Sequence, residues 1–157
     1  MRRLLSSGLV VFAGVVSPVV VSHRQADPPQ PPEHRQDRRF ETLRRFFQKF
    51  DCPAQHYSGA FLEAADRNDL DWRLLPSLSY VESTGGKAAR RNNIFGWDSG
   101  RAEFASPSES IQRVADRLGH SDLYRDKDLD SILATYNPSV EYGQKVKAVM
   151  RRISAGE

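Results

Sequence analysis

The chain has 157 residues, 39% of them hydrophobic and 27% charged, which is enough for one soluble domain with a hydrophobic core. Residues 1–50 hold 9 of the 23 Lys and Arg but only 4 of the 20 Asp and Glu, whereas the other 107 residues hold 14 and 16. The basic excess therefore belongs to the N-terminal part, which argues against a nucleic-acid partner for the folded part. The single cysteine, Cys52, excludes an intrachain disulfide and a cysteine-based zinc site.

Residues 1–22 are typical of an export signal. A pair of arginines after Met1 precedes an apolar run over residues 4–21, and a polar stretch follows. The end of the run is a poor match to a small-residue cleavage site, and its length is near the lower limit for a membrane-spanning helix. We therefore expect an exported protein, periplasmic or extracellular, whose residues 1–22 are either a cleaved signal peptide or an anchor in the inner membrane.

A linker and a helix are predicted next. Residues 23–34 are rich in proline and nearly free of apolar side chains, so they predict a disordered linker. Residues 35–50 place phenylalanines and a leucine at helical spacing among arginines, which predicts an amphipathic helix with a basic face. This helix could lie on an anionic membrane surface, or its aromatic stripe could dock on the domain predicted for residues 51–157.

The sequence of the first half of that domain predicts two helices and a hairpin. Residues 56–68 have a helical pattern, and Asp71 is a suitable N-cap for a second helix over residues 72–83. Two short apolar-alternating runs, residues 94–97 and 101–104, flank a turn and predict a small β-hairpin.

The second half predicts three helices with clear start signals. Residues 106–109 form a capping box with proline at the first helical position, opening a helix that ends near Gly119. Residues 128–136 repeat the pattern, and Ser139 begins the last helix. The predicted fold class is therefore mainly α, with about five helices and one small hairpin.

Glu82 is the main candidate for a catalytic residue. It ends an apolar helix, where partial desolvation favours the protonated form of a carboxyl group. Glycines, asparagines and Trp97 follow it, and cleavage of a glycosidic bond requires a protonated acid together with aromatic or amide groups that hold sugars. The sequence contains no metal box, phosphate loop or dinucleotide motif, so we expect no metal and no cofactor. The alternative is that Glu82 is a plain helix-end carboxylate, although the helix dipole disfavours an acid there.

Four blocks resemble the lysozyme-like peptidoglycan hydrolases, in particular the bacterial N-acetylglucosaminidase (glucosaminidase domain) family: PSLSYVES (76–83), NNIFGW (92–97), ATYNP (134–138) and YGQKV (142–146). The resemblance covers about residues 56–153. It implies a lysozyme-like α-helical fold and an endo-β-N-acetylglucosaminidase that cleaves peptidoglycan glycan strands between N-acetylglucosamine and N-acetylmuramic acid. Lytic transglycosylases share the Glu-Ser and Tyr-Asn pairs, but NNIFGW stands here in place of their Gly-Leu-Met-Gln block.

The resemblance also implies roles for single residues. It makes Glu82 the general acid and places Tyr136 in the cleft. Asp98 and Glu103 are candidates for a second catalytic carboxylate; if both are ordinary turn residues, the N-acetyl group or the C6 hydroxyl of the substrate supplies the nucleophile, as in transglycosylases. The candidate substrate-binding residues are Ser83, Asn92, Asn93, Phe95, Trp97 and Asn137. Structural roles in turns, helix ends and core packing are their alternatives, and a catalytically silent glycan-binding module is the second hypothesis for the domain.

Overall fold

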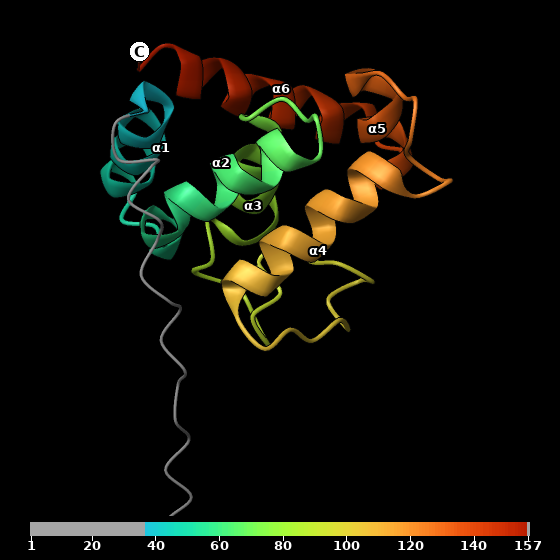
Figure 1. The fold of residues 1–157 in the computed structure, drawn as a ribbon, viewed down its shortest axis with the longest axis horizontal. Helices are drawn as coiled ribbons and strands as arrows, with labels where there is room; N and C mark the ends of the chain where they lie inside the picture. The colour runs from blue at the N-terminus through green and yellow to red at the C-terminus, as the bar shows by residue number, and fades with distance from the viewer. Residues whose placement is uncertain (1–36, 157) are drawn as a thin grey trace, which may run out of the picture.

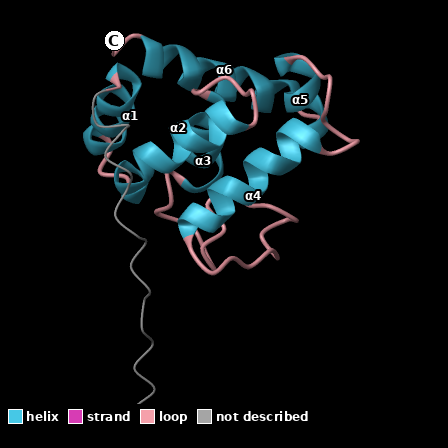
Figure 2. Cartoon of the chain, viewed as in Figure 1, coloured by secondary structure: helices cyan, strands magenta, loops and turns pink. Residues whose placement is uncertain are grey.

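The computed structural model describes residues 37–156. Within this range the chain forms six α-helices and one short 3-10 helix and contains no β-strand (Figure 1, Figure 2). The elements in chain order are α1 (Arg38–Lys49), η2 (Pro53–Tyr57), α2 (Ser58–Arg67), α3 (Leu74–Ser83), α4 (Pro107–His120), α5 (Leu129–Tyr136) and α6 (Val140–Ser154). The mainly-α class is therefore confirmed for the described residues.

The predicted signal or anchor, residues 1–22, and the predicted linker, residues 23–34, lie outside the described residues. From residue 37 to residue 156, none of the helices combines the length and the apolar character needed to cross a membrane.

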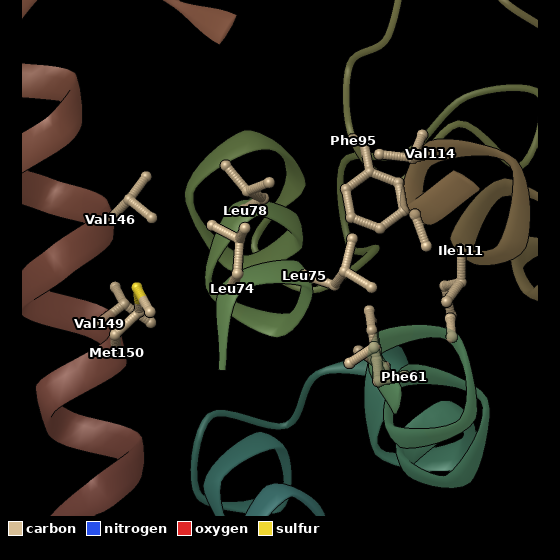
Figure 3. Close-up of a cluster of buried hydrophobic side chains, with 14 of the residues drawn as sticks. Phe61, Leu74, Leu75, Leu78, Phe95, Ile111, Val114, Val146, Val149 and Met150 are labelled. Atoms are coloured by element: carbon tan, nitrogen blue, oxygen red, sulfur yellow. The ribbon is translucent and has the colours of Figure 1, made fainter. Parts of the chain in front are cut away.

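Helix α3 lies at the centre of the hydrophobic core. Its leucines point in two directions: Leu74 and Leu78 face α6 (Figure 3). Leu75 points the opposite way, toward Phe61 of α2 and Phe95 of the loop that follows α3. All five side chains are at most 1% exposed, and burying each contributes about 1.5–3 kcal/mol. Packing on both sides thus fixes α3 and, with it, the position of its C-terminal end.

Helix α1 packs by its aromatic side and leaves its basic side exposed. Asp37 caps the helix, because its carboxylate accepts a hydrogen bond from the backbone N–H of Arg39 at 2.8 Å. Phe46 is 8% exposed, and its ring lies 5.3 Å from the ring of Tyr80 in α3. The predicted amphipathic helix is therefore present, and its aromatic stripe is buried in the domain.

Helices α2 and α3 begin later than predicted. Helix α3 starts at Leu74 instead of Trp72, and its N-cap residue, Arg73, makes no side-chain cap. Asp71, the predicted cap, accepts a hydrogen bond from the backbone N–H of Arg73 at 2.9 Å and also binds its guanidinium. The carboxylate thus closes a tight turn before the helix, a local bond that competes with capping. Helix α2 starts at Ser58, after a 3-10 turn.

The prediction of a β-hairpin over residues 94–104 is wrong, since the described residues contain no strand. The segment folds as consecutive turns, because Asp98, Ser99 and Gly100 have left-handed φ angles of 53°, 54° and 80°. The N–H of Gly100 donates to the carbonyl four residues earlier at 2.9 Å, so the chain turns back before a second strand can form. The side-chain amide of Asn93 occupies backbone groups that a ladder would have used.

The last three helices start where the sequence predicted. Each predicted cap accepts a hydrogen bond from the backbone N–H three residues later: Ser106 at 3.1 Å, Asp128 at 2.8 Å and Ser139 at 3.3 Å. Glu109 completes its capping box one residue further out than usual, by accepting from the N–H of Ala105 at 2.7 Å. These bonds satisfy N–H groups that have no partner inside the helix.

Candidate active site

Glu82 lies at the C-terminal end of α3, where the chain leaves the helix abruptly. Thr84 has a left-handed φ of 54°, and its N–H bonds back to the carbonyl of Tyr80 at 2.9 Å. Gly85 follows with a φ of 59°, and a Cβ at this position would lie 2.8 Å from the Cβ of Cys52, so only glycine fits. The sharp exit leaves Glu82 half-buried at the edge of the core.

The two carboxyl oxygens of Glu82 have different surroundings. The hydroxyl of Tyr142, from α6, donates a hydrogen bond to Oε1 at 2.7 Å. Gly96 approaches Oε2: a Cβ on this residue would lie 2.8 Å from that oxygen, and its φ is 60°. Glycine is therefore required here both for the backbone conformation and for the close approach. Among the described residues, Oε2 accepts no hydrogen bond.

Two tyrosines stack beside this carboxyl group. The rings of Tyr136 and Tyr142 are 5.9 Å apart and nearly parallel, and the Tyr136 hydroxyl donates to the carbonyl of Phe95 at 2.7 Å. Burial raises the pKa of Tyr136, and the negative charge of Glu82 adds to the shift. Burial and the hydrogen bond to Glu82 likewise raise the pKa of Tyr142. Both hydroxyls therefore stay protonated at neutral pH and act as hydrogen-bond donors.

Two pockets adjoin at Glu82, and we call the two together the groove. We call the larger pocket, of about 780 Å³, the long arm and the smaller, of about 330 Å³, the short arm. Glu82 and Asn137 line both arms, so the arms meet at the carboxyl group. The long arm is lined further by Gly96, Trp97, Asp98, Ser99, Ala102, Arg117, Tyr124 and Tyr136. The short arm is lined further by Val81, Ser139, Tyr142 and Lys145.

The groove brings together several residues that the sequence predicted for the site. Tyr136, Trp97 and Asn137 lie in it with Glu82, and the Trp97 ring meets the Tyr136 ring edge-on at 5.5 Å between centroids. Asp98 lines the long arm and is exposed. Its hydrogen-bonded ion pair with the guanidinium of the nearby Arg101, at 2.6 Å, holds the pKa of Asp98 below its usual range. Asp98 is therefore ionised at neutral pH.

Ser83 and Phe95 do not line the groove. Ser83 is 4% exposed; its hydroxyl donates to the carbonyl of Ile94 at 2.7 Å and accepts from the N–H of Gly86 at 2.9 Å. Phe95 is fully buried. Both residues fasten the loop after α3 to the end of that helix, and they thereby place Gly96 against the carboxyl group.

The two predicted asparagines and Glu103 also lie outside the groove lining. Asn93 is 4% exposed, and its amide donates to the carbonyls of Trp97 and Ala102 at 2.9 and 3.2 Å and accepts from the Trp97 N–H at 2.8 Å. Asn92 is exposed and donates to two carbonyls just before α4. Glu103 is exposed. The asparagines therefore shape the loop, and Glu103 is placed away from Glu82's groove.

Sequence reasoning missed Tyr142 as a site residue, together with Arg117, Tyr124 and Lys145. Tyr142 lies on the buried side of the last helix and is 8% exposed. A buried tyrosine usually finds a partner for its hydroxyl, so the residue type itself was a signal. Its partner, Glu82, lies 60 residues away along the chain, and nothing in the spacing indicates that pairing.

No family model, no curated protein and no solved structure matches this chain. Within residues 37–156, no group of three or more His, Cys, Asp or Glu side chains is placed to hold a metal ion. The function is therefore argued from the groove and its side chains.

Proposed function

We propose that the protein is a lysozyme-like peptidoglycan hydrolase that cleaves the glycan strand between N-acetylglucosamine and N-acetylmuramic acid, with Glu82 as its general acid. The observation that carries this proposal is the carboxyl group of Glu82, held by Tyr142 at the point where two arms of an open groove meet. A polymer lying along both arms would have one of its bonds beside that carboxyl group. The sequence resemblance to the N-acetylglucosaminidases supplies the identity of the sugars.

Tyr142 determines which oxygen of Glu82 delivers the proton. Because the tyrosine hydroxyl donates to Oε1, that oxygen is an acceptor, and the acidic proton is carried by Oε2. Oε2 faces Gly96 on the wall of the long arm, from where the proton can pass to the oxygen of the leaving sugar. Trp97 offers an apolar ring to sugar C–H groups, and the amide of Asn137 can bind an N-acetyl group.

Asp98 is the carboxylate available for the second half of the reaction. It is ionised and lines the same arm as Glu82, so it can activate a water molecule or stabilise the cationic transition state. Its exposure and its pairing with Arg101 favour a second candidate function, that of a lytic transglycosylase, in which the C6 hydroxyl of the substrate attacks and no second carboxylate is needed. Hydrolysis leaves reducing N-acetylglucosamine ends, whereas transglycosylation leaves anhydro-muramic ends, so mass spectrometry of the products distinguishes the two.

The test of the proposal is Glu82→Gln, which is nearly isosteric but cannot donate an acidic proton. We expect release of soluble muropeptides from purified sacculi to fall by at least about 10²-fold, because general-acid catalysis contributes about 10²- to 10⁴-fold. The melting temperature and binding to sacculi should not change. Glu41→Gln is the matched control, since Glu41 lies on α1, outside the groove, and pairs with Arg44.

Two outcomes would contradict the proposal. Activity of Glu82→Gln above about a tenth of that of the wild type would remove Glu82 as the acid. Binding of the wild type to sacculi without any release of muropeptides would instead identify a catalytically silent glycan-binding module.

The proposed substrate requires export from the cytoplasm. Peptidoglycan lies outside the inner membrane, and residues 1–22 have the arginine pair and apolar run of an export signal or anchor. A fusion of residues 1–34 to a reporter that is active only outside the cytoplasm should show activity. A reporter that stays inactive and cytoplasmic would contradict export, and N-terminal sequencing of the mature protein would separate cleavage from membrane anchoring.

A further inference from the structure

We propose that Lys145 in the short arm and Arg117 in the long arm bind carboxylates of the substrate, so that the groove selects an anionic glycan over a neutral one. This inference rests on the proposed function, because it assigns a ligand chemistry to the two arms of the same groove. The observation behind it is that each arm carries one exposed cation without an ion-pair partner among residues 37–156.

Lys145 stands in the short arm beside the residues that hold the acid. It lies on α6 three residues after Tyr142 and lines the arm together with Glu82 and Asn137. Glu141, one turn earlier on the same helix, accepts a hydrogen bond from the hydroxyl of Ser139 at 2.7 Å; the charge of Lys145 helps to lower the pKa of Glu141, but the two side chains form no direct ion pair. The ammonium group therefore remains available to a ligand.

The next lysine on α6, Lys147, differs from Lys145 in its ion pairing. Lys147 lies outside both arms and is paired with Asp130 at 2.6 Å. On this helix, the lysine away from the groove is in direct contact with a carboxylate, whereas the lysine in the groove interacts with Glu141 only at longer range.

In the long arm, Arg117 is likewise an exposed cation without an ion pair among the described residues. It is exposed on α4, and no ion pair of its guanidinium occurs among the described residues. Arg113, one turn earlier and outside both arms, lies 3.5 Å from Glu109. The acid of the long arm, Asp98, is paired with Arg101, so its charge does not compensate Arg117. Each arm thus presents an exposed cation that forms no direct ion pair among the described residues.

The chemistry of the glycan explains why cations in the groove would strengthen substrate binding. A polymer of N-acetylglucosamine alone offers only hydroxyl and amide groups, which gain little from a free ammonium or guanidinium. In peptidoglycan, every second sugar carries a carboxylate, either on its lactyl group or on the attached peptide. Charge-assisted hydrogen bonds to a carboxylate are roughly twice as strong as neutral ones, and Arg binds this group in a bidentate manner.

The unequal arms fit the spacing of these carboxylates. A cut between N-acetylglucosamine and N-acetylmuramic acid leaves a muramic unit directly beside the cut on one side, but one sugar further away on the other. The short arm, of about 330 Å³, suits the adjacent muramic unit, with Lys145 at its carboxylate. The long arm, of about 780 Å³, suits an N-acetylglucosamine followed by the next muramic unit, with Arg117 at its carboxylate.

The experiment compares native glycan strands with strands whose carboxylates have been converted to amides. The full-length wild type should show a KM about fivefold lower for native than for amidated strands, with equal kcat, as expected for partly exposed charge pairs. Lys145→Met and Arg117→Met should each lose part of this preference, and the double variant should lose all of it. Arg151→Met is the matched control, because Arg151 is an exposed cation on α6 outside both arms, and it should keep the full preference.

Binding measurements separate this inference from the proposed function. The Glu82→Gln variant should bind native strands about fivefold more tightly than amidated strands, whether or not the wild type releases muropeptides. Equal affinity for both strands, or a preference that survives in the double variant, would overturn the inference while leaving Glu82 as the acid. Absence of muropeptide release by the wild type, with the binding preference intact, would overturn the proposed function and leave the carboxylate-binding cations.

Discussion

The single hydrogen bond from Tyr142 makes the carboxyl group of Glu82 asymmetric. Oε1 accepts the tyrosine proton at 2.7 Å, so Oε2 is the oxygen that can carry a proton of its own. The raised pKa of Tyr142 ensures that its hydroxyl remains a donor over the whole neutral range. In the proposed reaction, Tyr142 therefore acts through Glu82 and is a positioning residue.

Tyr142→Phe tests this role. Phenylalanine keeps the ring that stacks on Tyr136 at 5.9 Å and removes only the hydroxyl. Glu82 becomes negatively charged as it gives up its proton in the proposed reaction, and a hydrogen bond to a charged group contributes about 1.5–3 kcal/mol. We therefore expect kcat to fall by about 10- to 100-fold with KM nearly unchanged. The measurement is steady-state release of muropeptides. Tyr80→Phe, outside the groove, is the control, and a kcat equal to the wild type in Tyr142→Phe would show that the orientation of Glu82 does not depend on this bond.

The sequence singles out Glu82 as a candidate, whereas it gives no indication of the hydrogen-bond partner of Glu82. The candidate acid was found because a carboxylate at the end of an apolar helix is a local, one-dimensional pattern. The assignment of Tyr142 requires α6 to lie against α3, which is a property of the packed core. Four residues were predicted to bind substrate because they lie near Glu82 in the sequence: Ser83, Asn92, Asn93 and Phe95. In the structure they support the loop after α3 and do not line the groove.

The loop between α3 and α4 is the element that gives the groove its wall. It contains no strand, and its shape depends on side-chain amides that replace backbone pairing. The two neighbouring asparagines differ in burial, since Asn93 is 4% exposed and Asn92 is exposed. They therefore form a matched pair for measuring how much the inner network matters.

We expect Asn93→Ala to lower the free energy of unfolding by about 2–3 kcal/mol and Asn92→Ala by about 1 kcal/mol or less. The difference arises because the first substitution leaves part-buried backbone groups of Trp97 without their partner, whereas water can reach those freed by the second. Urea unfolding monitored by circular dichroism gives both values. Equal effects of the two substitutions would mean that the inner amide does not hold the loop.

The sequence predicted the last three helix starts correctly, but it did not predict the structure of residues 94–104. The caps at Ser106, Asp128 and Ser139 were predicted because a cap bond joins residues only three apart. Asp71 does not cap α3, because its carboxylate accepts a hydrogen bond from the N–H of Arg73, only two residues later. The hairpin prediction was wrong because alternating apolar residues indicate only that one side of the segment is buried. A series of turns can bury that side as well as a strand can.

Three tyrosines in the groove make the stability of the folded protein depend on pH in the alkaline range. Burial raises the pKa values of Tyr124, Tyr136 and Tyr142 above their ordinary value of 10.0. A raised pKa means that the folded state holds the proton more tightly than the unfolded state does. The stabilisation is therefore complete below pH 10 and is lost as the pH rises above 10, where the unfolded chain ionises first.

We expect the free energy of unfolding to decrease above about pH 10 by as much as about 1.4 kcal/mol per pH unit for each of these tyrosines. Urea unfolding between about pH 8 and pH 11 measures the slope. Tyr142→Phe should make the alkaline slope shallower without changing its sign, because one of the three ionising groups is removed. An unchanged slope would show that the burial of Tyr142 has no energetic weight.

The mainly-α class follows from local periodicity, whereas the groove does not. Its lining comes from the end of α3, the following loop, α4, α5 and α6, which are brought together only when both faces of α3 are packed. For the same reason, the cations Arg117 and Lys145 look like ordinary surface charges in the sequence. Only their place in the linings that they share with Glu82 distinguishes them from the other surface cations.

If a glycan strand lies along both arms as proposed, neither of its ends has to sit at Glu82. The protein could therefore settle on any stretch of a long strand, and its cuts would fall at scattered places. Early in the reaction the average strand length would drop steeply while very few small fragments appeared. In a cross-linked network, such scattered cuts relax tension and widen the mesh long before they dissolve the material.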